Sequence, residues 1–235
     1  SGIEYYRHKR IPGGCRMSRK LFISVASRSI PLLLNETLWC LGTATLTQIY
    51  STRGLDVIAA LNIGFVLSDL FTSLSFSIGS TIAIMVGQEL GSGDTERAVD
   101  TDRKLIVFGL FISFALCILI LASAPAFPRF YNTSPEIREL ATRLIRVIGA
   151  VLPLDTIAHM CYFTLRSGGM AGVTFLFDSG FSWAVNVPAA WLLAHLTDIA
   201  IVPLFTISVM TVIVKCVIGT VLVRKRVWVN TLSAG

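Results

Sequence analysis

The sequence predicts an all-α membrane protein in which six transmembrane helices form one compact lobe. Three observations lead to this fold class. Hydrophobic residues make up 54% of the 235 residues and charged residues only 14%, whereas about 25% are charged in a typical soluble domain. Apolar runs long enough to cross a bilayer, which takes about 20 residues, recur six times along the chain. Most Lys and Arg residues lie between or outside these runs.

The six runs define the expected elements in order. We expect the transmembrane helices at approximately Phe22–Tyr50, Val57–Val86, Leu105–Phe127, Ala141–Leu165, Val173–His195 and Ile199–Val223. Residues 1–21 then form a basic cytoplasmic stub or a linker to another lobe, residues 22–226 the six-span lobe, and residues 227–235 a cytoplasmic tail. The chain opens in a polar stretch without Met or a signal peptide, which indicates a processed product or a fragment of a longer chain.

The connections between the spans alternate in charge. Thirteen Lys and Arg residues lie in the stub, the second-to-third connection, the fourth-to-fifth connection and the tail. The other side has five: Arg53, Arg129, Arg138, Arg143 and Arg146. Because cytoplasmic loops carry the excess of Lys and Arg, we expect a multi-pass protein of the inner (plasma) membrane with both termini in the cytoplasm. The net charge of +6 then faces anionic lipid, and no aromatic-interleaved basic patch indicates nucleic acid.

Two connections contain helix-start signals. Ser134, Pro135 and Glu136 suit the cap, the first position and the first turn of a helix. In the polar stretch before the third span, Asp94 or Thr95 can cap a short helix. The GSGD sequence there matches intramembrane aspartyl proteases, but such enzymes also need a Tyr-Asp pair, which the chain lacks.

Two carboxylates lie within apolar runs. Glu36 is the only charge in Ile30–Tyr50, and Asp155 lies in the fourth run. A charged side chain at the bilayer centre costs roughly 3 kcal/mol or more and usually faces a cavity or a partner. We therefore predict a site in which Glu36 and Asp155 bind and release a cation within the membrane.

Asp155 belongs to a polar face of the fourth span. Asp155, His159, Tyr162 and Arg166 follow the spacing i, i+4, i+7 and i+11, which places them on one side of a helix. A carboxylate and an imidazole one turn apart can share or pass a proton. The alternative for His159 is an interior histidine that only makes a hydrogen bond. Pro153 frees a main-chain carbonyl that can also ligate a cation.

Further polar and aromatic residues in the spans either line a cavity or hold helices together. Aromatic walls also suit large apolar cations. The residues that we expect to line a substrate cavity are Asn35, Trp39, Asn62, Asp69, Tyr162 and Asp178.

An ordered set of motifs resembles a known family. The set is PLLLNETLW, TRG, IAALNI, VGQELGSGDTERA, FYNTSPEI, LRSGG and a Trp-x4-Pro pair from Trp183 to Pro188. In this order and spacing, the chain resembles the C-terminal lobe of multidrug and toxic compound extrusion (MATE) transporters over about Ser27 to Arg226. The resemblance implies twelve spans in two lobes, so we expect a second six-helix lobe that is fused, separate or supplied by self-association.

The resemblance also assigns roles to residues. In cation-coupled members the C-terminal lobe carries a Glu on its first span and an Asp on its fourth, where Glu36 and Asp155 stand. Some sodium-coupled members have a Tyr one turn before the Asp, and Val151 stands there in this chain. We therefore favour H⁺ over Na⁺ as the coupling ion, with Na⁺ at Glu36 and Asp155 as the alternative, and we expect no other cofactor.

The function that follows is antiport of H⁺ or Na⁺ against drugs or organic cations by alternating access. One alternative is a lipid-linked saccharide flippase, which would line its cavity with several Arg. Apart from Arg143 and Arg146 at the start of the fourth span, the spans contain only Arg28 and Lys215, both near span ends. The other is a non-transporting half that assembles with a partner. No nucleophile–base pair or Cys/His cluster indicates an enzyme, and the five cysteines suit packing.

Overall fold

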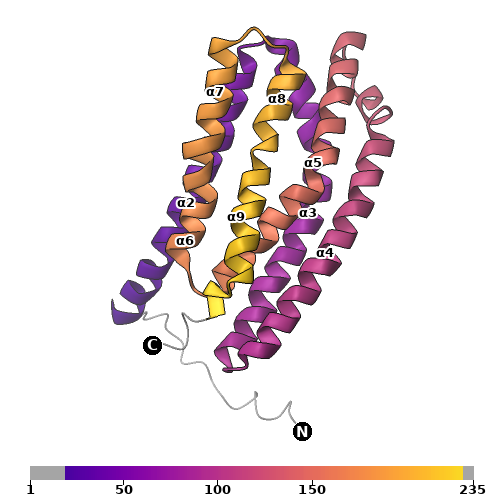
Figure 1. The fold of residues 1–235 in the computed structure, drawn as a ribbon. Coiled ribbons are helices and arrows are strands. Elements are labelled where there is room, and N and C mark those ends of the chain that lie inside the picture. Colours follow the sequence, from indigo (N-terminus) through magenta and orange to yellow (C-terminus); the bar gives the residue numbers. More distant parts are fainter. Residues whose placement is uncertain (1–18, 230–235) are drawn as a thin grey trace, which may run out of the picture.

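Within residues 19–229, six long helical segments run back and forth along a common axis (Figure 1). The computed structural model describes residues 19–229, so most of the predicted stub and most of the predicted tail lie outside the described residues. Two short 3-10 turns, η1 (Phe127–Phe130) and η4 (Val227–Val229), accompany the long segments. The long segments are α2 (Arg19–Ser51), α3 (Leu55–Gly91), α4 (Thr95–Ser123), α5 (Pro135–Ser167), the run from α6 (Ala171–Phe175) to α7 (Val187–Leu196), and the run from α8 (Ile201–Met210) to α9 (Val212–Arg224). The all-α fold with six segments is therefore confirmed.

Two helices begin earlier than the hydropathy predicts. The polar stretch before the third span is not a separate short helix, because α4 runs without a break from Thr95. The Asp94 carboxylate caps it by accepting a hydrogen bond from the Arg97 amide at 3.1 Å. At α5, Ser134 caps as predicted and accepts from the Ile137 amide at 3.3 Å. Both helices therefore extend past the apolar runs into polar surroundings.

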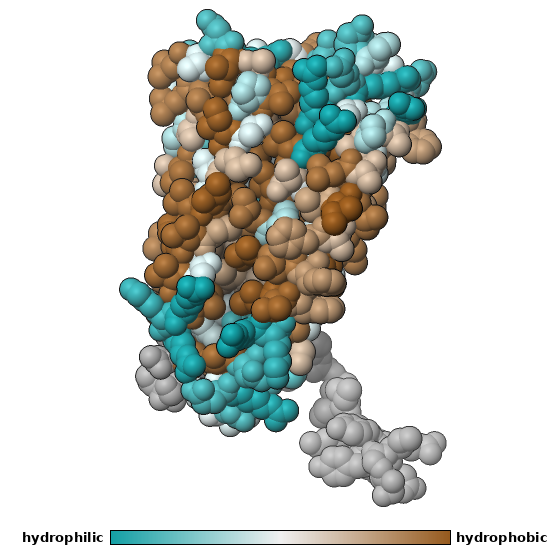
Figure 2. All heavy atoms as spheres, turned by 45° about the vertical axis from the view of Figure 1, so that its right-hand side comes forward, coloured by the Kyte–Doolittle hydropathy of each residue, from teal (hydrophilic) through white to brown (hydrophobic). Residues whose placement is uncertain are grey.

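The surface of the lobe has a hydrophobic band between two hydrophilic ends (Figure 2). Within the described residues, four segments are long and apolar enough to cross a membrane: α3, α4, α5 and the α8–α9 run. The polar residues Asn35 and Glu36 lower the hydropathy of α2, and two π-helical stretches divide the α6–α7 run into short helices. These two segments carry Asn35, Glu36, Asp178 and Ser179.

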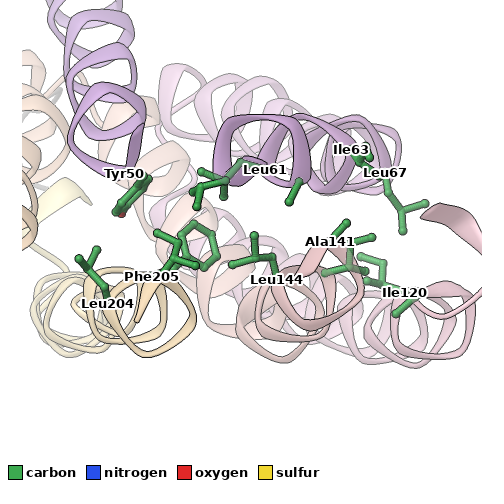
Figure 3. Packing of buried hydrophobic residues seen from close by; sticks show 14 of the residues in the cluster. Tyr50, Leu61, Ile63, Leu67, Ile120, Ala141, Leu144, Leu204 and Phe205 are labelled. Atoms are coloured by element: carbon green, nitrogen blue, oxygen red, sulfur yellow. The ribbon is translucent and has the colours of Figure 1, made fainter. Parts of the chain in front are cut away.

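Helix α5 lies at the centre of the lobe and packs against α3, α4, α8 and α9. One apolar cluster includes Leu61, Leu144 and Phe205, with Tyr50 placed edge-on to the Phe205 ring at 5.4 Å (Figure 3). In lipid such packing is not driven by the hydrophobic effect but by close van der Waals contact and interhelical hydrogen bonds. Gly79 on α3 permits that contact, because a Cβ atom there would lie 2.2 Å from the Phe163 ring of α5.

Side-chain contacts also join neighbouring segments at each end of the lobe. At one end the Arg53 guanidinium donates to the main-chain oxygens of Ala194 and Thr197, which joins the α2–α3 turn to the α7–α8 connection. At the other end Arg226 pairs with Glu96 at 2.8 Å, and Trp228 of η4 is buried. The connections predicted to be cytoplasmic lie at this second end, together with the end of α9. Which end faces the cytoplasm stays a prediction.

Candidate cation and substrate site

The α6–α7 run is interrupted by two π-helical stretches, η2 (Leu176–Gly180) and η3 (Ser182–Asn186). Such stretches are rare and occur frequently at functional sites. Here they bring Asp178, Ser179 and Trp183 against α2 near its middle. The Trp183 indole donates to the main-chain oxygen of Leu38 at 2.9 Å, and this contact anchors the widened helix.

Asn35 on α2 is the hub of a polar network that joins three segments. Its Nδ2 donates to Asp178 Oδ2 at 3.3 Å and to the Tyr162 hydroxyl on α5 at 3.4 Å. The Ser179 hydroxyl lies 2.7 Å from Asn35 Oδ1 and 2.8 Å from the Asn35 main-chain oxygen. Asn35 is only 3% exposed, so its amide is satisfied inside the lobe. The structure thus brings together three of the predicted cavity residues, Asn35, Tyr162 and Asp178.

A fourth helix joins the network through an ion pair. Lys215 Nζ on α9 lies 2.6 Å from Asp178 Oδ1, and the two side chains are 17% and 16% exposed. The ammonium also lies 5.3 Å from the centre of the Phe177 ring. Sequence analysis placed Lys215 near a span end, but it lies well inside the α8–α9 run, nine residues before Arg224. Its positive charge is therefore part of the membrane interior and is matched by Asp178.

Asp155, half-buried on α5, has a different environment. Its carboxylate makes no hydrogen bond or ion pair within residues 19–229, although Lys215 and His159 lie within electrostatic range. The hydrogen bond from Cys216 Sγ to the Leu154 main-chain oxygen, at 3.0 Å, holds α9 against α5 at this level. Asp155 is thus a carboxylate next to the network but without a bonded partner in it.

His159 does not bond to the Asp155 carboxylate. Its Nδ1 lies 2.9 Å from the Asp155 main-chain oxygen, and its ring is 5.4 Å from the Phe76 ring. Since a carbonyl oxygen only accepts, Nδ1 carries the hydrogen, and Nε2 is the atom left to take up a proton. A proton relay between His159 and Asp155 stays a prediction, and it would run through Nε2.

Glu36 lies near the middle of α2 and is exposed in the lobe. Within the described residues it makes no hydrogen bond or ion pair, and none joins it to Asp155. Its charge does act on the Tyr162 phenol, as do those of Asp178 and Arg166. Glu36 and Asp155 therefore border the same region, from the α2 side and the α5 side, without touching.

The remaining predicted cavity residues lie apart from the network. Trp39, Asn62 and Asp69 are exposed on α2 and α3, and no hydrogen bond or ion pair joins their side chains to other described residues. The carbonyl that Pro153 frees belongs to Gly149, six residues before Asp155. At 1.5 Å per residue, it lies about 9 Å along the helix from Asp155, too far to share a cation with that carboxylate.

Lys215 and Ser179 were not predicted from the sequence as members of the network. The signal for Lys215 was a cation with apolar residues on both sides. Its partner Asp178 lies on another span, so no local pattern joins the two. Within residues 19–229, no group of three His, Cys, Asp or Glu residues has metal-binding geometry. What the site offers is a pair of carboxylates without bonded partners beside a satisfied polar network.

Comparison with known proteins places this lobe in a family. The model of the MatE family matches residues 31–192, more than half of the chain. The chain belongs to the MatE family. Members of this family are transporters and not enzymes, which confirms the expectation that the chain is not an enzyme.

Solved MATE structures share the fold of this MatE lobe. A crystal structure of MATE in the straight conformation has a TM-score of 0.82 at 16% identity, covering 99% of this chain and 53% of that chain. An outward-facing multidrug resistance MATE transporter of the MOP superfamily gives 0.81 at 16% identity (93% and 49% covered). An inward-facing one gives 0.79 at 15% identity (92% and 50%). The MatE chain thus spans about half the length of the structures that it matches.

Proposed function

We propose that this chain forms one lobe of a cation-coupled antiporter that exports organic, often cationic compounds by alternating access. The lobe would pair with a second six-helix lobe, either fused, separate or another copy. Glu36 and Asp155 would bind the coupling cation, and the polar network at Asn35 would position the helices that carry them. The protein would lie in the plasma membrane with the basic end of the lobe in the cytoplasm.

The proposal rests on the contrast between two carboxylates near Lys215: Asp178 is paired with this lysine, and Asp155 is not. Lys215 is bonded to Asp178, so Asp178 is neutralised within the lobe. Asp155 and Glu36 have no bonded partner among the described residues. A carboxylate within a membrane span needs a counter-charge or a proton. A cation that enters and leaves the site is the partner that this arrangement lacks.

A proton fits the site better than Na⁺. Hard cations prefer several oxygen ligands around them. In this lobe Glu36 and Asp155 do not touch, and the carbonyl freed by Pro153 lies too far along α5. A proton needs only one carboxylate, and His159 follows Asp155 one turn later on α5. This choice of ion is our proposal.

The exposed polar residues on α2 and α3 support a second lobe. Glu36 and Asp69 lie within spans and are exposed in the isolated lobe, where lipid could not satisfy them. A second lobe facing them would enclose a polar cavity, with Trp39 in its wall. The lobe resembles the outward-facing and inward-facing MATE structures almost equally. That similarity is expected if each lobe moves as a rigid unit.

Substitution of Glu36 tests the proposal in cells. We expect Glu36→Gln in the complete transporter to abolish efflux of ethidium, because the variant cannot release a proton. Expression should hold, since loss of a charge within a span eases insertion by up to about 3 kcal/mol. The matched control is Thr37→Val, because the Thr37 hydroxyl bonds only within its own helix, to Leu33 at 2.8 Å. Normal efflux in Glu36→Gln would rule out the role of Glu36.

A further inference from the structure

A second polar feature lies at the opposite end of the lobe from Arg226 and Trp228. A cavity of about 580 Å³ opens between η1 and the first turns of α5. We name it the Arg pocket, because its lining includes Arg129, Arg138, Arg143 and Arg146, with Glu139 as the only acidic residue in that lining. Figure 2 shows hydrophilic residues gathered at the upper end of the lobe. The site proposed for transport uses none of these residues.

The positive charge in the Arg pocket is mostly uncompensated. Glu139 is already paired with Arg143 at 2.5 Å. Arg138 donates through Nη2 to the Tyr131 main-chain oxygen at 3.0 Å, but its Nε is buried without a hydrogen-bond partner. Arg129 and Arg146 form no ion pair within residues 19–229. Three guanidinium groups therefore share one concave surface without an acidic partner, and their mutual repulsion favours binding of an anion.

Membrane topology does not explain this concentration of charge. In the orientation proposed above, this end faces away from the cytoplasm, where Lys and Arg are depleted. Four of the five Lys and Arg residues counted on that side nevertheless line the same pocket. All four are Arg, whose planar fork matches the oxygen atoms of a phosphate group, and none is Lys.

The walls of the pocket are set by residues that restrict the backbone. Pro125, Pro128 and Pro135 all line it, and each fixes its own φ angle. The first turn of α5 also leaves main-chain N–H groups directed toward its start, which favours negative charge there. Arg138, Thr142 and Arg146 follow at i, i+4 and i+8, so they lie on one face of α5. These features limit the conformations that the pocket walls can adopt.

We propose that the Arg pocket binds the phosphate group of an anionic ligand. The surrounding surface favours a lipid headgroup as the source of that phosphate. Phe130 of η1 is 83% exposed beside the pocket, and the neighbouring α4 presents exposed Ile118 and Leu119 along its length. Aromatic side chains at this level of a membrane protein lie among headgroups, and Arg side chains bind phosphate oxygens through paired hydrogen bonds.

The test measures binding to the purified complete transporter in a neutral detergent. The probes are phosphatidylglycerol, phosphatidylcholine and inorganic phosphate, and the readouts are bound lipid by native mass spectrometry and the melting temperature. The double variant Arg138→Gln with Arg146→Gln removes two guanidinium groups. Arg129→Gln is a second variant, because Arg129 is exposed and its loss does not disturb packing. The control is Arg103→Gln with Lys104→Gln, in the basic pocket at the opposite end.

We expect phosphatidylglycerol to bind at least tenfold more tightly than phosphatidylcholine, and both pocket variants to lose that preference while the control keeps it. If millimolar inorganic phosphate does not displace bound phosphatidylglycerol, the site is assigned to a lipid headgroup. Displacement by phosphate assigns it to a free anion. Equal binding of phosphatidylglycerol by wild type and both pocket variants would overturn the proposal. Since Glu36 and Asp155 lie elsewhere, efflux results do not affect this outcome.

Discussion

The Thr164 hydroxyl donates a hydrogen bond to Oδ1 of Asp102 at 2.6 Å, joining α5 to α4 across 62 residues of sequence. Asp102 is only 3% exposed, and Thr164 is fully buried. The Thr164 hydroxyl also contacts the Met160 main-chain oxygen at 3.0 Å. Asp102 does not stand out in the sequence, because it precedes the apolar part of its helix. The contact is a polar link between two helices at the end of the lobe predicted to face the cytoplasm.

Removal of this hydroxyl should destabilise the lobe. Thr164→Val keeps the side-chain shape but leaves a buried carboxylate without its donor, which costs about 1–3 kcal/mol. For a protein of this size we expect the melting temperature in detergent to fall by about 2–4 °C per kcal/mol.

Thr142→Val is the matched control for this prediction. Thr142 lies on the same helix, and its hydroxyl bonds only to the Arg138 main-chain oxygen at 2.8 Å. It should therefore melt close to wild type. Equal melting temperatures for Thr164→Val and Thr142→Val would show that the Asp102 contact does not stabilise the fold.

The contact of Gly79 with Phe163 leads to a second stability prediction. Gly79→Ala places a Cβ atom 2.2 Å from the Phe163 ring, so the ring or the two helices must shift. Such overpacking typically costs about 1–3 kcal/mol. Gly87→Ala, on the same helix, is the control because nothing lies within 4 Å of its Cβ. At position 87, alanine lowers the entropy of the unfolded chain, which should raise the free energy of unfolding by about 0.4–1 kcal/mol. A melting temperature of Gly79→Ala at or above that of Gly87→Ala would contradict the close packing.

The orientation of the lobe predicts which end an impermeant reagent reaches. In a variant lacking the five native cysteines, we expect Phe130→Cys to react with an impermeant maleimide in intact cells. Lys225→Cys should react only after the membrane is opened. Both positions are exposed in the lobe and lie at opposite ends. Labelling of Lys225→Cys alone in intact cells would invert the proposed orientation.

The helices could be predicted from sequence because each is encoded locally. Apolar runs of about 20 residues and the Ser134 cap specify α5 without reference to other parts of the chain. Hydropathy does not locate the helix ends, since Thr95 to Lys104 is polar and yet continues α4. Capping by Asp94 decides that start, whereas hydropathy reports only the part of the helix within lipid.

The site was only partly predictable, for a different physical reason. Glu36 and Asp155 stand out because a carboxylate within an apolar run is costly anywhere. The partners of Asp178 do not stand out, since Asn35 and Lys215 reach it from helices 143 and 37 residues away. The π-helical stretches that place Asp178 were not predicted from the sequence. Only the structure therefore shows which charged residues pair across helices.

Proton coupling at Asp155 is the central claim of the proposed function. The most direct measurement is ethidium transport by the complete transporter reconstituted in vesicles, under an imposed pH gradient without sodium and under a sodium gradient without a pH difference. We predict transport that follows the pH gradient, loss of that dependence in Asp155→Asn, and normal behaviour of Asp100→Asn, whose carboxylate is exposed and paired with Lys104 at 2.6 Å. Transport that needs the sodium gradient and ignores pH, or an Asp155→Asn variant that follows pH like wild type, would contradict the account.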